Sequence, residues 1–294
     1  MSPEEVTREV RRLEITTRHL VRDIMAGEYS SAFRGRGVEF AEVREYQPGD
    51  DIRTIDWNVT ARLGSAYVKR YLEERELTVL FVADQSASAS FGSVRRTKGD
   101  LTIEVGSVLA LAAARNNDRV GAVFATDRVE HYVAPRKGRR QALRVISDLL
   151  AFEPRGAGTD LGAALGYLEP MLRRRAVIFL VSDFLGSGYE AALGRLARRH
   201  DLIAIQVLDP RERELPDVGL VTLWDAESGA WRVVDTSDRG LRERFRGRAT
   251  EFDEQLERTL LEAGADLLRL ETGAASYAEP LLAFFRRRES RLWR

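Results

Sequence analysis

The 294-residue chain contains no cysteine and no long apolar run. The lack of cysteine excludes disulfides, thiolate zinc sites and cysteine nucleophiles, and it suits a reducing cytoplasm. The apolar stretch 176–181 is far shorter than the roughly 20 residues that a membrane helix needs. The charged N-terminus also lacks the apolar region of a secretory signal. We therefore expect a soluble, cytoplasmic protein without a membrane span.

The chain has no excess of charge of either sign, because 46 basic residues balance 46 acidic ones. A neutral chain has no overall field that would attract nucleic acid, so we expect no nucleic-acid partner. The arginine run 286–288 is interpreted as a solvated helix end. Lysine is scarce: it occurs only at positions 69, 98 and 137, and all other basic residues are arginine, which favours bidentate pairs with carboxylates.

Motifs of common enzymes are missing as well. No Gly-x-x-x-x-Gly-Lys-Ser/Thr sequence occurs, so ATP hydrolysis by a P-loop is not expected. His19, His131 and His200 are scattered over the chain, and none lies where a Ser-His-Asp triad or a metal pair could be argued. We therefore predict that the protein is not an enzyme.

From residue 77 onward the chain alternates between buried strands and helices. Continuous apolar runs are typical of strands that are covered on both faces. Such runs occur at 77–84, 119–126, 176–183 and 202–208, with shorter strands predicted at 131–133 and 266–270. Helices are predicted at 102–115, 139–151, 160–174, 189–199, 240–263 and 277–290. This alternation predicts an α/β fold with a doubly wound, mostly parallel, Rossmann-type sheet.

Two segments depart from the alternation. Residues 219–236 contain two alternating runs around a turn, which predicts an inserted β-hairpin. Residues 4–26 have the pattern of a surface helix, and a segment rich in glycine, aromatic and β-branched residues follows it. We therefore divide the chain into an N-terminal helix plus β-rich segment, 1–76, and a sheet domain with its hairpin insertion, 77–294.

Polar side chains follow two of the buried strands. Asp84, Ser86 and Ser88 come at the end of the first strand, and Asp183 ends the strand that begins near residue 176. Thr159 directly precedes a predicted helix. Ligands of open α/β sheets bind at the carboxyl ends of the strands. If the two strands are neighbours, these five residues converge at one edge of the sheet.

Two carboxylates and three hydroxyls form a donor set for a hard cation. Magnesium fits best, while manganese and calcium also accept oxygen ligands. So few formal charges leave the ion under-neutralised, with room for a carboxylate from a partner. The alternative is that each residue only caps a local turn or helix. Taken together, the residues favour a metal site that captures a partner protein.

Three motifs resemble the metal-ion-dependent adhesion site of von Willebrand factor A domains. They are Asp84-Gln85-Ser86-Ala87-Ser88, Gly158-Thr159-Asp160-Leu161-Gly162 and Val181-Ser182-Asp183. The resemblance implies that both serines and the threonine contact the metal, while the aspartates act directly or through water. It also implies that an acidic residue of the partner completes the coordination. Ala89 replaces the methionine of many members, but this position is not a ligand.

The segment before the sheet domain resembles a bacterial family, the domain of unknown function number 58. The motifs are GRGVEF (35–40), REYQPGDDIRTIDWNVTAR (44–62) and VKRYLEER (68–75). Members usually accompany MoxR-type AAA+ ATPases. The resemblance therefore implies an adaptor or co-chaperone that binds such an ATPase or its client. Many members have membrane helices before this segment; their absence here implies a soluble form.

We interpret the charges of this segment as an ion-pair network that holds it against the sheet domain, with Trp57 as apolar anchor. The charged residues are Arg44, Asp50, Asp51, Arg53, Asp56 and Arg62. The alternative is a docking surface for a partner. Residues 34–37 are interpreted as a turn rather than an anion site.

Two other functions remain open for the whole chain. Asp84 facing Asp183 resembles the carboxylate pair of a metal-dependent phosphohydrolase, although Ser86 stands where such enzymes carry a second carboxylate. A structural scaffold without metal is the third possibility.

Overall fold

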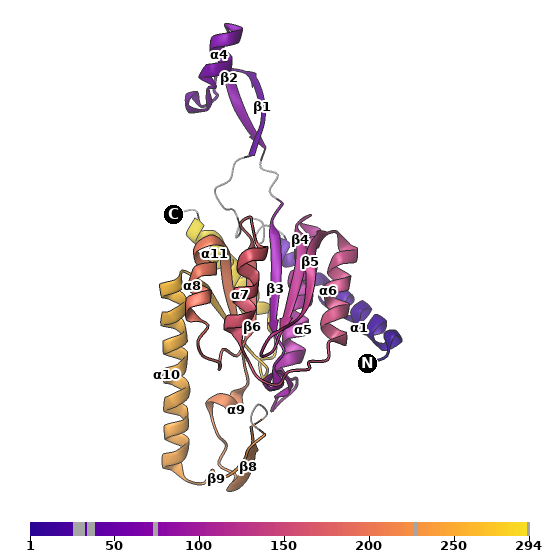
Figure 1. Ribbon diagram of the computed structural model, residues 1–294, viewed down its shortest axis with the longest axis vertical. Coiled ribbons are helices and arrows are strands. Elements are labelled where there is room, and N and C mark those ends of the chain that lie inside the picture. Colours follow the sequence, from indigo (N-terminus) through magenta and orange to yellow (C-terminus); the bar gives the residue numbers. More distant parts are fainter. Residues whose placement is uncertain (26–32, 34–38, 73–75, 226–228, 293–294) are drawn as a thin grey trace. The chain divides into compact units, whose positions relative to one another are not determined.

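The computed structural model describes residues 1–25, 33, 39–72, 76–225 and 229–292 (Figure 1). The chain divides into two compact units. The larger unit, here called the sheet unit, comprises residues 1–33 and 77–294, and the smaller unit comprises residues 34–76. Each unit is described separately below.

A six-stranded sheet forms the centre of the sheet unit. Its strands are β3 (Thr78–Asp84), β4 (Arg119–Ala125), β5 (Val129–Lys137), β6 (Val177–Ser182), β7 (Asp201–Leu208) and β10 (Asp266–Glu271). Their order in the sheet is β10-β7-β6-β3-β4-β5, and only β5 runs antiparallel to its neighbour. The predicted α/β class with a mostly parallel sheet is confirmed.

Helices cover both faces of this sheet (Figure 1). One face carries α1 (Pro3–Thr16), α2 (Arg18–Met25), α5 (Lys98–Arg115), α6 (Arg139–Ala151) and α11 (Ala278–Leu292). The other carries α7 (Leu161–Met171), α8 (Glu190–Arg199) and α10 (Arg239–Ala263). Neighbouring strand residues alternate between two cores: Phe81 packs in the first and Leu80 in the second. Within the described ranges, no helix is both long and apolar enough to span a membrane.

The N-terminal helices belong to the sheet unit and not to the β-rich segment with which we had grouped them. Leu13 and Ile24 are buried in the same core as Phe81, and Phe33 packs edge-to-face against Phe179. The single predicted helix is two, because α1 ends at Thr16 and α2 begins at Arg18. The buried apolar contacts of these helices therefore place them in the sheet unit. The boundary that we predicted at residue 76 did not take these contacts into account.

The smaller unit contains an antiparallel pair, β1 (Glu39–Glu45) and β2 (Tyr67–Leu72), with η1 (Ile52–Thr54) and α4 (Trp57–Leu63) between them. Arg44 pairs with Asp50 at 2.6 Å. Asp51 and Asp56 accept backbone N–H groups at the starts of η1 and α4. Trp57 is 69% exposed, and its role as an anchor against the sheet domain stays a prediction. The turn predicted at 34–37 lies outside the described residues.

The predicted hairpin is confirmed as β8 (Leu220–Trp224) and β9 (Trp231–Asp235). It follows the short helix α9 (Pro210–Arg213), and Figure 1 shows both beyond the carboxyl ends of the parallel strands. Trp224 and Trp231 pack side by side with ring centroids 6.0 Å apart, yet they are 55% and 67% exposed. The hairpin therefore presents apolar side chains to solvent near that edge of the sheet.

Candidate metal centre

The two strands that end in the predicted site residues are direct neighbours. β3 and β6 pair in parallel from Val79 opposite Val177 to Ala83 opposite Val181. This register places Asp84 and Asp183 at the same edge of the sheet. The chain leaves β3 for β4 on one side and later returns to β6 on the other. The edge is therefore the kind of switch point at which open α/β sheets bind ligands.

Four of the five predicted residues are joined by direct contacts. The Ser86 N–H donates to Asp84 Oδ1 at 3.0 Å, and the hydroxyls of Ser86 and Ser88 are 3.1 Å apart. Ser88 Oγ donates to Asp183 Oδ2 at 2.8 Å. These contacts link residues from two strand ends that are 95 positions apart in the sequence. The structure thus brings together side chains of two motifs that are far apart in the sequence.

Thr159 belongs to a loop that lies against the same edge. The N–H of Ala87, between the two serines, donates to the Ala157 carbonyl at 2.9 Å. A Cβ atom at Gly186 would lie 3.4 Å from Thr159 Cγ2, so Thr159 adjoins the turn that follows Asp183. The loop therefore carries Thr159 to the edge of the sheet at which the other four residues lie.

Glu130 holds that loop in place, a role that we did not predict. Its carboxylate accepts the N–H groups of Arg155 and Gly156 at 2.9 and 2.8 Å and the Thr126 hydroxyl at 2.6 Å. Desolvation acts to raise the pKa of Glu130, but these hydrogen bonds outweigh it and hold the pKa below its ordinary value. An ionised Glu130 thus anchors the loop that presents Thr159.

Burial shapes the electrostatics of Asp84. Only 6% of this residue is exposed, and burial together with the nearby charge of Asp183 raises the pKa of its carboxyl above the ordinary value. Two hydrogen bonds oppose the shift: Ser182 Oγ donates at 2.6 Å and the Ser86 N–H at 3.0 Å. The ionised form of Asp84 is therefore costly unless a cation lies close to it.

A positively charged side chain that sequence reasoning missed lies at the site. Lys98, the first residue of α5, is only 3% exposed. Its Nζ donates to Asp183 Oδ2 at 2.6 Å and to Glu212 Oε1 at 2.5 Å. Burial would lower the pKa of Lys98, but the charges of Asp183 and Glu212 outweigh it and raise the pKa. Burial raises the pKa of Glu212 despite the ammonium beside it.

The scarcity of lysine was the signal that could have identified Lys98. Arginine fills nearly every basic position, so Lys98 is an exception, and its compact ammonium contacts two carboxylates. Glu212 lies in α9, a helix of four residues that our sequence analysis did not predict. Its link to Lys98 joins the segment that leads into the hairpin to the edge of the sheet.

The donor set fits a hard divalent cation. Carboxylates and hydroxyls are the oxygens that magnesium prefers, and three carboxylates with one ammonium leave two formal negative charges at this edge. Within the part of the chain that the structure describes, no group of three or more histidine, cysteine or acidic side chains is placed to hold a metal. A metal here would therefore depend on the hydroxyls of Ser86, Ser88 and Thr159.

The mostly parallel sheet, with these side chains at its carboxyl edge, defines a doubly wound α/β protein with polar groups gathered at a switch point. The chain belongs to the family described as protein of unknown function DUF58, whose sequence profile matches residues 42–255. This confirms the resemblance noted from the sequence.

Two uncharacterised mycobacterial proteins are similar over most of the chain. Rv1480 of Mycobacterium tuberculosis and Mb1516 of Mycobacterium bovis are each 36% identical over 266 residues, which cover 90% of this chain and 84% of theirs.

The comparison with solved structures gives matches at low sequence identity. BatB from Bacteroides thetaiotaomicron has a TM-score of 0.50 and 15% identity, with 73% of this chain and 99% of that one covered. The von Willebrand factor A domain of SpRpn10 has a TM-score of 0.36 and 11% identity, with 70% and 93% covered.

Proposed function

We propose that the protein is a metal-dependent protein–protein interaction module. In this proposal Asp84, Ser86, Ser88, Thr159 and Asp183 hold one divalent cation at the carboxyl edge of the sheet. Magnesium is the expected ion, and manganese and calcium are the alternatives. The observation that supports the proposal is the direct contact among carboxylates and hydroxyls from β3 and β6.

The charge of the site suits the capture of an acidic partner. Lys98 already neutralises part of the charge on Asp183, which it contacts at 2.6 Å. A divalent ion added to this site meets few uncompensated carboxylates, so it retains affinity for a further anionic oxygen. A carboxylate of a partner protein supplies that oxygen. The bound ion contributes electrostatic attraction, while the residues of this chain position it and exclude water.

The surroundings of the site supply a second contact for such a partner. Figure 1 shows the hairpin on the side toward which the parallel strands point. Leu220 and Val233 on this hairpin are 74% and 70% exposed. Exposed apolar groups of this kind mark interaction surfaces. The proposed partner therefore offers an acidic residue next to apolar ones.

Family membership suggests which partner to test. Because relatives of this family usually accompany MoxR-type AAA+ ATPases, we propose that the chain acts as adaptor or co-chaperone of such an ATPase, or binds its client. No catalytic role is part of this proposal.

The first test is whether the site binds metal. Wild type and Asp84→Ala are unfolded by heat in EDTA and in magnesium, manganese or calcium, with the exposed Asp23→Ala as control. We expect a metal-dependent rise in Tm for wild type and Asp23→Ala, and none for Asp84→Ala. An equal response of all three proteins would refute the assigned site.

The second test concerns the partner. A purified MoxR-type ATPase is passed over the same three immobilised proteins, with metal or with EDTA. Retention by wild type and Asp23→Ala in metal alone supports the adaptor role. Equal retention by all three proteins, with metal and with EDTA, rules out the metal site as the point of contact.

One observation supports a second candidate function, a metal-dependent phosphohydrolase. The ammonium of Lys98 beside Asp183 could neutralise a phosphoryl oxygen as well as a carboxylate. Turnover of p-nitrophenyl phosphate that needs magnesium and disappears in Asp84→Ala would favour this second function.

A further inference from the structure

The sheet has one parallel edge strand whose outer side is open. β10 pairs with β7 on one side, and no other strand pairs with it among the described residues. The N–H of Thr272, just after β10, donates to the Leu208 carbonyl of β7 at 2.9 Å. Because alternate residues direct their N–H groups to opposite sides, those of Leu267, Arg269 and Glu271 point to the open edge. An extended chain can pair with such an edge.

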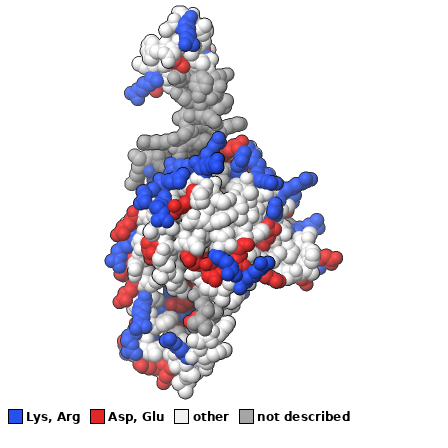
Figure 2. Space-filling view, viewed as in Figure 1, with Lys and Arg blue, Asp and Glu red and all other residues white. Residues whose placement is uncertain are grey.

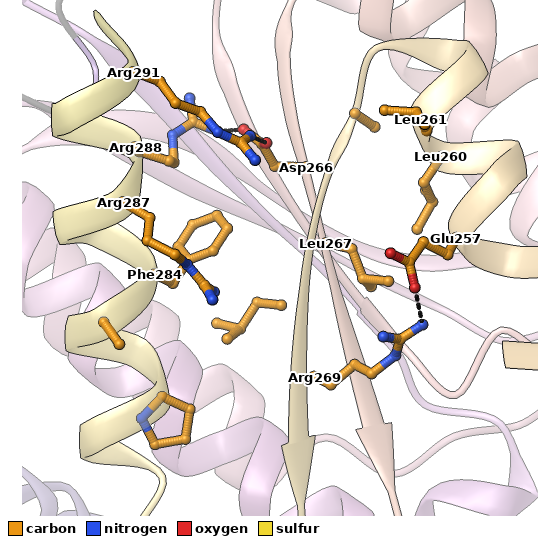
Figure 3. A pocket seen from close by; sticks show the side chains of 14 residues that line it. Glu257, Leu260, Leu261, Asp266, Leu267, Arg269, Phe284, Arg287, Arg288 and Arg291 are labelled. Atoms are coloured by element: carbon orange, nitrogen blue, oxygen red, sulfur yellow. Dashed lines mark hydrogen bonds and ion pairs between the residues drawn. The ribbon is translucent and has the colours of Figure 1, made fainter. Parts of the chain in front are cut away.

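A groove of about 490 Å³ follows this edge (Figure 3). Five consecutive residues, 265–269, line it, which places the groove along the strand edge rather than over one face. α10 contributes Leu260 and Leu261 on one side, and α11 contributes Ala283 and Phe284 on the other. Leu261 is 76% exposed. The groove thus has apolar walls on both sides of an unpaired strand.

The α11 side of the groove is strongly basic. Arg287, Arg288 and Arg291 line it, and Figure 3 shows the Arg287 side chain directed from α11 toward β10. Arg288 is engaged by Asp201 at 2.6 Å and also by Asp266. In contrast, Arg287 is exposed and has no acidic side chain within 4.0 Å among the residues that are described. Arg287 is therefore available to an incoming anion.

A second copy of the chain fits this edge poorly. Antiparallel pairing of two β10 strands about Arg269, near the middle of the strand, would place this arginine opposite its own copy, and like charges directly opposite one another are destabilising. The same two-fold arrangement would bring both α11 helices to one face of the joined sheet, so that their exposed arginines would meet. Charge therefore favours an acidic occupant over a second copy.

We propose that the β10 edge binds an extended acidic peptide segment of a partner, which adds as a seventh strand to the sheet. Main-chain hydrogen bonds to β10 provide affinity, and side chains that alternate between two faces provide specificity. Acidic side chains of the peptide face Arg287 and Arg291, and apolar ones face Leu261 on the α10 side. This site is separate from the proposed metal site and does not depend on it.

The test uses a fluorescein-labelled octapeptide of alternating Glu and Val, measured by anisotropy in EDTA so that no metal can attract it. The proteins are wild type, Arg287→Glu, Arg287→Lys and a matched control, Arg173→Glu, at another exposed arginine. We expect binding to wild type, to Arg287→Lys and to the control, with affinity about tenfold weaker for Arg287→Glu because attraction becomes repulsion. An octapeptide of alternating Lys and Val is expected not to bind.

Strand addition is tested on the peptide, so that the fold of the protein is untouched. Two versions are N-methylated, one on the Glu residues and one on the Val residues. We expect one version to lose binding, because its methyl groups replace the N–H groups that face β10, and the other to retain it. Binding that survives both methylations, equal binding to Arg287→Glu, or no binding to wild type would each overturn the proposal. Sedimentation that shows a dimer weakened by the peptide would identify a second copy as the occupant and would also overturn it.

Discussion

The carboxyl edge of the sheet and the β10 groove both contain cations beside carboxylates, but in different environments. The Lys98–Asp183 pair is enclosed, with 4% of each side chain exposed. The Arg291–Asp266 pair at the groove has a contact distance of 3.0 Å, yet 72% of the arginine side chain is exposed. When one partner of a buried pair is removed, water cannot solvate the charge that remains. When one partner of an exposed pair is removed, water can. Contacts of similar length therefore differ in energy because of burial. On the face visible in Figure 2, acidic and basic side chains are interspersed over the sheet unit.

The largest effect is expected at the enclosed cation. Lys98→Met leaves Asp183 and Glu212 facing each other without the ammonium that contacts both. Removal of one member of a buried pair costs about 3–5 kcal/mol, and we expect a loss of that size in urea unfolding at neutral pH in EDTA. The exposed Arg173→Met is the control and should change stability by less than about 0.5 kcal/mol.

Magnesium sharpens this first comparison. If the ion binds at the same edge, it supplies the charge that Lys98→Met lacks, so its stabilising effect should be greater for the variant than for wild type. A variant as stable as wild type in EDTA would show that the ammonium does not neutralise these carboxylates.

The sequence predicted the ends of the strands better than the groups that surround them. Asp84 and Asp183 follow continuous apolar runs, and buried parallel strands leave little freedom in where they end. Lys98 was missed because α5 begins there, four residues before the helix start that apolar periodicity indicated. Long-range contacts, such as Lys98 with Glu212 across 114 positions, have no local pattern. The same holds for Glu130, which acts on a loop 25 residues away.

A smaller effect is expected at Asp84, where burial raises the pKa. A raised carboxyl pKa means that stability from this group is present at low pH and is lost as the pH rises through the folded-state value. Asp84→Asn removes the buried charge, so in EDTA at neutral pH we expect it to stabilise the fold by on the order of 1 kcal/mol.

The pH dependence of the stability gain distinguishes removal of a buried charge from a change in packing. The gain from Asp84→Asn should shrink as the pH falls toward the ordinary aspartate value of 3.8, because protonated Asp84 is then neutral too. In magnesium the variant should lose its advantage, since the ion stabilises only the wild-type carboxylate. A gain that is constant with pH would point to packing instead of charge.

The smallest effect is expected at the exposed Arg291, and the buried Arg288 of the same helix α11 provides the comparison. The Arg288 side chain is only 10% exposed. Its guanidinium bonds Asp201 and Asp266 and lies over the Phe33 ring, and Arg288→Ala removes these contacts. We expect a loss of about 2 kcal/mol on unfolding by urea, because two acidic groups lose a charged hydrogen bond. Arg291→Ala should cost at most about 0.5 kcal/mol and less in high salt, because its pair with Asp266 is screened. Equal losses for the two variants would mean that burial does not determine the energy of these ion pairs.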